Sequence, residues 1–456
     1  MVNDQIAVTS PIYRQSCEKI RKREKKSLSL QPIMANYNTA TLPNGLRIIH
    51  LPSASPVVYC GIGINTGSRQ ERANEEGLAH FCEHVSFKGT RRRSSLQILN
   101  CLESVGGDLN AFTNKEDTIF YAAILKDHLP KAVDLLTDIV FCSQYPEDEI
   151  QHEADVICDE IESYNDSPAE LIYDEFENLL FNGHPLGHNI LGTREQVLHF
   201  TSEHARQFTS QHYRPDNAIF FAYGDVDFST LVKKIKACSP CESVTNNRET
   251  ITNNHETITN NRETITNNRE TITNNRETIT NNHEHHQAHV MIGCKAFAFD
   301  DPNRMPLYLL NNILGGPGMN ARLNLSLRER AGLVYTVESS MAAYSDAGCW
   351  SVYFGCDHHD VKRCLTLVRR ELDRMMQHPL SSRQLQAAKR QLRGQITIAC
   401  DNREQLALDF AKNYLHYGRE RNIADILAQI DDISASQLQD VAQELFAPAR
   451  MQQLIL

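Results

Sequence analysis

Apolar residues follow two spacings along the chain, alternation that is typical of strands and three- to four-residue repeats that are typical of helices. The first half opens with β-branched runs on either side of Pro43-Asn44-Gly45, which predicts a hairpin. Helical spacing then alternates with strand-like runs up to about residue 164. This pattern predicts a sheet backed by helices. The predicted elements are strands over 38–51, 56–66 and 108–125 and helices over 77–90, 94–105, 129–141 and 147–164.

The second half repeats the layout of the first. A strand is predicted over 289–298 and a helix over 306–314, and residues 325–354 parallel residues 99–123. Three amphipathic helices are expected to cover the second sheet. We therefore predict an α/β (α+β) fold of two homologous domains, each a mixed, mostly antiparallel sheet backed by helices. The three covering helices are predicted over 361–377, 381–401 and 403–417.

Two segments lack this pattern and set the predicted domain limits. Residues 1–33 form a polar, basic lead that we predict to be disordered, with a mitochondrial presequence as the alternative. Residues 241–286 contain Thr-Asn-Asn-Arg/His-Glu-Thr-Ile at a period of seven. One large apolar residue per repeat favours an expanded linker, although a stacked array of short strands or turns stays an alternative. The domains are then residues 34–240 and 287–456.

Composition narrows the class of protein. The formal net charge of −11 argues against a nucleic-acid-binding protein, and no apolar run is long enough to cross a membrane. Thirteen cysteines occur without a regular spacing, so we expect reduced thiols in a cytosol-like compartment. The predicted location is cytoplasmic, with the mitochondrial matrix as the alternative.

The candidate chemistry lies in His80-x-x-Glu83-His84. In a helix these three side chains share one face, and the two imidazoles lie one turn apart. Two neutral imidazoles at this spacing can share a zinc ion, and Glu83 would lie beside the metal, where it could take a proton from zinc-bound water. The apolar residues of the helix fall on the opposite face: Leu78, Phe81, Cys82 and Val85.

A third ligand is expected from the helix over 147–164. Glu153 and Glu160 are seven residues apart, so they share a face at the shoulder of the apolar stripe, where carboxylates are half-buried. From the residues alone, each of them could equally be an ordinary solvated glutamate.

Four separated motifs give the chain a resemblance to a known family. Residues 77–90, together with 108–113, 183–187 and 213–217, resemble the pitrilysin and mitochondrial-processing-peptidase family of inverzincin zinc peptidases. The resemblance implies a zinc endopeptidase in which Glu83 is the general base. It also implies one zinc per chain and a supporting carboxylate, Glu153, that does not itself bind the metal. The implied ligands are His80, His84 and Glu160.

The resemblance further implies a substrate strand and a partner. An unfolded or presequence-like peptide is expected to lie along Asn110, Ala111 and Phe112, and Arg328 and Tyr335 are expected to contact it. The second domain lacks His-x-x-Glu-His and is expected to be non-catalytic. We expect a homodimer, or a heterodimer with a related half, with no nucleic-acid or membrane partner. The alternatives are a non-catalytic peptide-binding or scaffold subunit and a zinc-stabilised binding protein without turnover.

Overall fold

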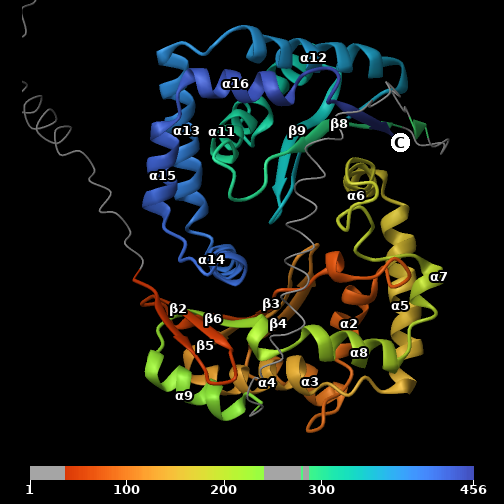
Figure 1. The fold of residues 1–456 in the computed structure, drawn as a ribbon, viewed down its shortest axis with the longest axis vertical. Coiled ribbons are helices and arrows are strands. Elements are labelled where there is room, and N and C mark those ends of the chain that lie inside the picture. Colours follow the sequence, from red (N-terminus) through yellow and green to blue (C-terminus); the bar gives the residue numbers. More distant parts are fainter. Residues whose placement is uncertain (1–35, 241–278, 281–286) are drawn as a thin grey trace, which may run out of the picture.

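The computed structural model describes residues 36–240, 279–280 and 287–456 (Figure 1). Two sheets lie in opposite halves of the view, the sheet of the first half of the chain below and that of the second half above. The predictions for residues 1–33 and 241–286 lie outside the described residues, apart from Ile279–Thr280, which forms a short strand. The domain limits therefore stay predictions.

The first sheet has six strands in the order β1-β2-β6-β3-β5-β4, and only β2 and β6 pair in parallel. The predicted hairpin is confirmed, because β1 and β2 pair antiparallel across the Pro43-Asn44-Gly45 turn. β4 lies at the edge of the sheet, so one side of its backbone has no strand partner within the sheet. The strands are β1 Asn38–Thr41, β2 Arg47–Pro52, β3 Val57–Ile64, β4 Asp108–Thr113, β5 Thr118–Leu125 and β6 Ala218–Gly224.

The helices of the first half, except the one over Pro168–Leu180, pack on one face of this sheet and form the first core with it. The helix predicted over 147–164 is confirmed, and three acidic residues in its first turn complement the helix dipole. The helices are α2 Leu78–Ser86, α3 Ser95–Glu103, α4 Leu129–Cys142, α5 Glu147–Asn165, α6 Pro168–Leu180, α7 Arg194–Val197, α8 Ser202–His212 and α9 Phe228–Cys238, with short η1 Ser68–Gln70, η2 Lys126–His128 and η3 Pro215–Asn217.

The second sheet has the order β7-β11-β8-β10-β9, with β9 at one edge. Its strands pair antiparallel except β7 with β11. The strands are β7 Ile279–Thr280, β8 Ala288–Ala296, β9 Val334–Ala343, β10 Gly348–Cys356 and β11 Gln452–Ile455. The helices are α11 Arg304–Gly315, α12 Val361–Gln377, α13 Ser382–Ala399, α14 Arg403–Tyr417, α15 Ile423–Asp432 and α16 Ala435–Leu445, with η4 Asn324–Glu329 and η5 His358–Asp360. None of the described helices is both long and apolar enough to span a bilayer.

The two halves exchange one helix each. We predicted that residues 403–417 cover the second sheet, and this is wrong: α14 packs its Phe410 against Phe221 of the first sheet. In return, α6 packs Phe176 against a core that contains Met291 of the second sheet. Periodicity identifies an apolar face but does not identify the sheet that receives it. Figure 1 shows α14 and α6 between the two halves.

A buried ion pair crosses the interface under α14. The side chain of Asp117, in the turn between β4 and β5, is 8% exposed. Its carboxylate lies 3.0 Å from His416 Nε2 and 3.5 Å from Lys412 Nζ. Burial alone would raise the pKa of Asp117, but the hydrogen bond from His416 and the charge of Lys412 outweigh it and lower the pKa.

This pair should make the interface acid-sensitive. A lowered pKa contributes stability that is present above the unfolded-state value of about 3.9 and is lost as the pH falls through the folded-state value. Asp117→Asn should cost about 2 kcal/mol of unfolding free energy at pH 7. The difference between wild type and variant, measured by denaturant unfolding, should shrink below pH 4. A difference that is independent of pH would contradict the assignment.

Candidate metal centre and active site

Helix α2 is fixed at its start by a glycine and by a buried carboxylate. Gly77 has φ +94°, and a Cβ there would lie 2.6 Å from the carbonyl oxygen of Leu191. The backbone N–H groups of Gly77 and Ala79 donate to the Glu71 carboxylate at 3.0 and 2.7 Å. His188 Nε2 lies 3.0 Å from the same carboxylate. These contacts satisfy free N–H groups at the helix start and set the position of the histidines that follow.

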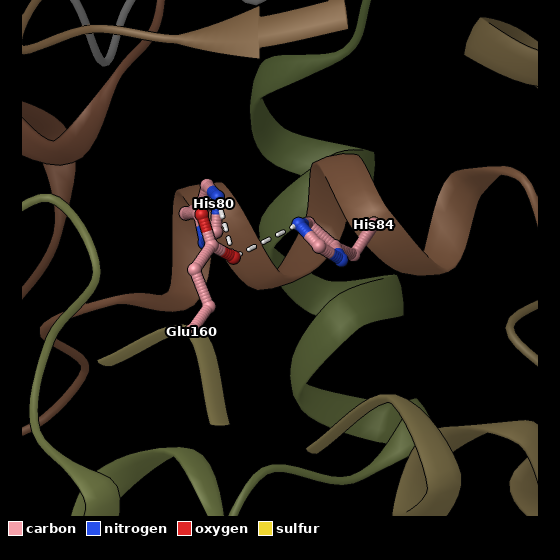
Figure 2. Close-up of side chains that lie close together, drawn as sticks. All are labelled: His80, His84 and Glu160. Atoms are coloured by element: carbon pink, nitrogen blue, oxygen red, sulfur yellow. Dashed lines mark ion pairs between the residues drawn. The ribbon is translucent and has the colours of Figure 1, made fainter. Parts of the chain in front are cut away.

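The structure brings His80, His84 and Glu160 together. Glu160 Oε2 lies 3.9 Å from His80 Nε2 and 3.6 Å from His84 Nε2. The two imidazole centroids are 4.6 Å apart. Figure 2 shows both histidines on α2 and the Glu160 side chain reaching toward them, with the two ion pairs dashed. The Glu160 side chain is 45% exposed, so the site is open to solvent on this side.

The donor set fits zinc. One donor atom from each of the three residues lies within 4.8 Å of the others. Ligands about 2.1 Å from a tetrahedral ion are about 3.4 Å apart, close to the separations observed here. Burial, together with the neighbouring His84, lowers the pKa of His80 to about 3, so this imidazole is neutral at pH 7 and can donate a lone pair. Two imidazoles and one carboxylate are the protein ligands of many catalytic zinc sites, which keep a position open.

Glu153 contacts the ring nitrogen of His84 that does not face Glu160. Its Oε2 lies 3.3 Å from His84 Nδ1, which leaves Nε2 directed at Glu160. Its other oxygen pairs with Lys88 Nζ. Burial favours the neutral acid, but the hydrogen bonds from His84 and Lys88 outweigh it and lower the pKa of Glu153. The expected half-buried position holds for neither glutamate: the Glu153 side chain is 5% exposed, and Glu160 is exposed.

Glu83 lies beside the cluster and is held by a hydroxyl group. Its Oε2 accepts a hydrogen bond from Thr113 Oγ1 at 2.6 Å. Burial raises the pKa of Glu83, and the bond from Thr113 opposes this only in part. A carboxylate with a raised pKa can accept a proton and later return it, as a general base requires.

The predicted substrate residues lie on the free edge of β4. Asn110 is exposed, while Ala111 packs against the first core and Phe112 faces the opposite side of the sheet, toward α14. Thr113, which holds Glu83, ends the same strand. A peptide added to this edge would therefore pass close to the base.

Arg328 and Tyr335 lie in the second half, at the rim of a cavity of about 570 Å³. The described residues that line this cavity include none of the three clustered residues. The Arg328 guanidinium lies 5.6 Å from the centre of the Tyr335 ring, and Tyr335 is 82% exposed. The structure does not bring this pair to the cluster within one chain.

Sequence reasoning missed several supporting residues. Thr113 entered the sequence analysis only as the last residue of the 108–113 motif. Because side chains alternate along a strand, Thr113 shares the face of Ala111, which packs in the core that also contains α2. Lys88, which pairs with Glu153, lies within the 77–90 motif but was not predicted to support the site. His188 belongs to none of the predicted sites, yet its Nε2 lies 3.0 Å from Glu71 Oε2. No local pattern connects His188 with Glu71, which lies 117 residues away.

Comparison with known proteins identifies the family. Residues 48–194 match the model of the insulinase family, peptidase family M16, and residues 199–392 match the model of the peptidase M16 inactive domain. The chain is 32% identical to an uncharacterized zinc protease of Streptomyces coelicolor over 89% of this chain and 86% of that protein. The chain therefore belongs to peptidase family M16.

Other similar proteins agree in sequence or in fold. The uncharacterized zinc protease YmxG of Bacillus subtilis is 29% identical over 89% of this chain and 95% of its own length. The crystal structure of a protease from Helicobacter pylori matches with a TM-score of 0.81, covering 93% of this chain and 100% of that chain. Its sequence identity is 21%, so this likeness concerns the fold. The two-domain fold is thus that of family M16.

Replacing Glu153 should weaken metal binding without unfolding the site. In Glu153→Gln the charge that holds His84 and Lys88 is lost, and supporting residues of this kind contribute about 10- to 100-fold in metal affinity. Competition with a fluorescent zinc chelator measures the change. Asp159→Asn, an exposed change on the same helix, is the control and should bind zinc like wild type. Equal affinity of all three proteins would contradict the role of Glu153.

Proposed function

We propose that this protein is a zinc-dependent endopeptidase that hydrolyses unfolded or presequence-like peptides. The observation that carries the proposal is the convergence of His80, His84 and Glu160 beside the buried carboxylate of Glu83. The free edge of β4 supports a peptide substrate. Names of relatives as zinc proteases agree with the same chemistry.

Substrate binding begins at β4. An extended peptide can add a strand along Asn110, Ala111 and Phe112 and pair with those backbone groups of this segment that face away from β5. Folded proteins cannot offer such a strand without local unfolding, which favours unfolded substrates. The pairing also brings the peptide toward the end of β4, where Thr113 holds the base.

His80, His84 and Glu160 would hold the zinc ion. The chemistry that bound zinc supplies is Lewis acidity, which polarises a scissile carbonyl and makes a water molecule more acidic. Glu83 takes the proton from the attacking water and then gives it to the leaving amine. Thr113 keeps the Glu83 carboxylate oriented during both transfers. Glu153 keeps His84 in the tautomer whose Nε2 can bind metal.

The proposal includes a second chain. Arg328 and Tyr335 are exposed and belong to a different part of the chain surface from the cluster. In a homodimer, or a heterodimer with a related half, they would reach the zinc site of the opposite chain. There the guanidinium can hold a peptide carbonyl and the phenol can donate to a developing oxyanion.

Removing the base should abolish hydrolysis and spare metal binding. Glu83→Gln should lower the rate of peptide cleavage by about a hundred-fold or more, because general base catalysis contributes 10²- to 10⁴-fold. Cleavage of a mixed peptide library by the wild type, with cut sites read by mass spectrometry, provides the assay. A chelator should stop the wild type, and added zinc should restore it. Zinc binding without any cleavage by wild type would favour a peptide-binding or scaffold subunit.

Two inactive chains should complement one another. The Glu83→Gln chain carries an intact Tyr335, and the Tyr335→Phe chain carries an intact Glu83. Mixing them after dissociation should recover roughly a quarter of wild-type activity, because half of randomly assorted dimers carry one complete site of two. Light scattering gives the mass of the active species. A fully active monomer, or a mixed dimer without recovery, would refute a site shared between chains.

A further inference from the structure

We propose that the second domain positions the catalytic base of its own chain. Helix α14 holds the turn between β4 and β5, and this turn fixes Thr113 against Glu83. The inference rests on the proposed function, because it assigns positioning residues to the same site. The contact between α14 and the turn is the hydrogen bond from His416 to the carboxylate of Asp117.

The turn between β4 and β5 is shaped by Asp117. The backbone N–H of Asn114 donates to the carbonyl oxygen of Asp117 at 2.7 Å, and the Asn114 side chain donates to the Asp117 carboxylate at 2.6 Å. Thr113 and Thr118 pair directly on either side of this turn. The position of Asp117 therefore sets where β4 ends and where Thr113 lies.

The second domain holds Asp117 through one face of α14. His416 Nε2 donates to the Asp117 carboxylate at 3.0 Å, while His416 Nδ1 lies 3.0 Å from the side-chain oxygen of Asn65. Lys412 Nζ lies 3.5 Å from the Asp117 carboxylate and 4.7 Å from the centre of the Phe112 ring. Residues just before and within the turn are thus in contact with the same helix.

A second contact from the other domain holds the neighbouring residue of the turn. Glu116 accepts hydrogen bonds from Ser345, from the backbone N–H at 3.1 Å and from the hydroxyl at 2.6 Å. Arg69 pairs with Glu116 at 2.6 Å and also with Asp346. Ser345 and Asp346 lie in the loop between β9 and β10. The turn is therefore held by two separate elements of the second domain.

The contact between α14 and the turn is linked to Glu83 by β4, along which successive side chains point to opposite faces. Phe112 faces α14, and the next residue, Thr113, faces α2 and donates to Glu83 at 2.6 Å. A shift of the turn moves Thr113 with it, because Asn114, which hydrogen bonds to Asp117, directly follows Thr113 in the chain. A general base must lie within hydrogen-bonding reach of its proton, so small displacements are costly.

Variants of the second domain test this inference, because they leave every residue of the first domain unchanged. His416→Phe keeps a ring but loses the hydrogen bond to Asp117 and the polar contact with Asn65, and it should lower kcat about tenfold with KM and zinc content unchanged. His416→Gln, whose amide can donate to Asp117, should retain most of the rate. Arg403→Gln is the control, because Arg403 lies on the same helix but contacts Ser55 and Val57 instead of the turn.

Hydrogen exchange provides a readout that does not need activity. In His416→Phe, but not in Arg403→Gln, amides of residues 108–118 and 78–86 should exchange faster than in wild type. If wild type cleaves no peptide, the proposed function fails. Faster exchange in both segments of His416→Phe would still support the link from α14 to the segment that contains Glu83. Unchanged exchange in residues 78–86 and 108–118, or unchanged kcat in an active enzyme, would overturn the inference.

Variants of Thr113, in the first domain, keep the inference testable if His416→Phe does not fold. Thr113→Val removes the hydroxyl that reaches Glu83 and should reproduce the fall in kcat. Thr113→Ser keeps the hydroxyl and should restore the rate. Wild-type kcat in Thr113→Val would overturn the inference, because the turn would then have no route to the base.

Discussion

The packing of α2 against α5 is the constraint on which the candidate site depends. His80 and His84 come from α2 and Glu160 comes from α5, so no single helix can assemble the three donors. The apolar face of α2 is buried in the first core, which fixes the rotation of the helix and directs both imidazoles toward α5. Metal affinity is therefore linked to the packing of a hydrophobic core.

The exchange of α6 and α14 makes the two domains mutually dependent. Each helix completes a core on the sheet of the other half. The domain without His-x-x-Glu-His therefore still shapes the site, since α14 contacts the strand and the turn that lead to Glu83. In a duplicated fold, one copy can in this way support the other.

Periodicity and turn residues predicted most elements to within a few residues, because strands and helices bury their apolar faces at different spacings. The spacing of Glu153 and Glu160, read together with a family resemblance, also predicted which carboxylate approaches the histidines. Other features depend on contacts between distant segments. Alternation along β4 indicates the face that Thr113 occupies, but the bond from Thr113 to Glu83 and the packing of α14 on the first sheet depend on distant segments, so they could not be predicted from the sequence.

The central claim is that one zinc ion binds where the two helices meet. Crystals of the zinc-loaded protein, measured on both sides of the zinc absorption edge, test it most directly. We predict one anomalous peak per chain, which marks a zinc ion bound by the Nε2 atoms of His80 and His84 and by a carboxylate oxygen of Glu160. A peak elsewhere, or a peak at the histidines with Glu160 turned away, would contradict the account.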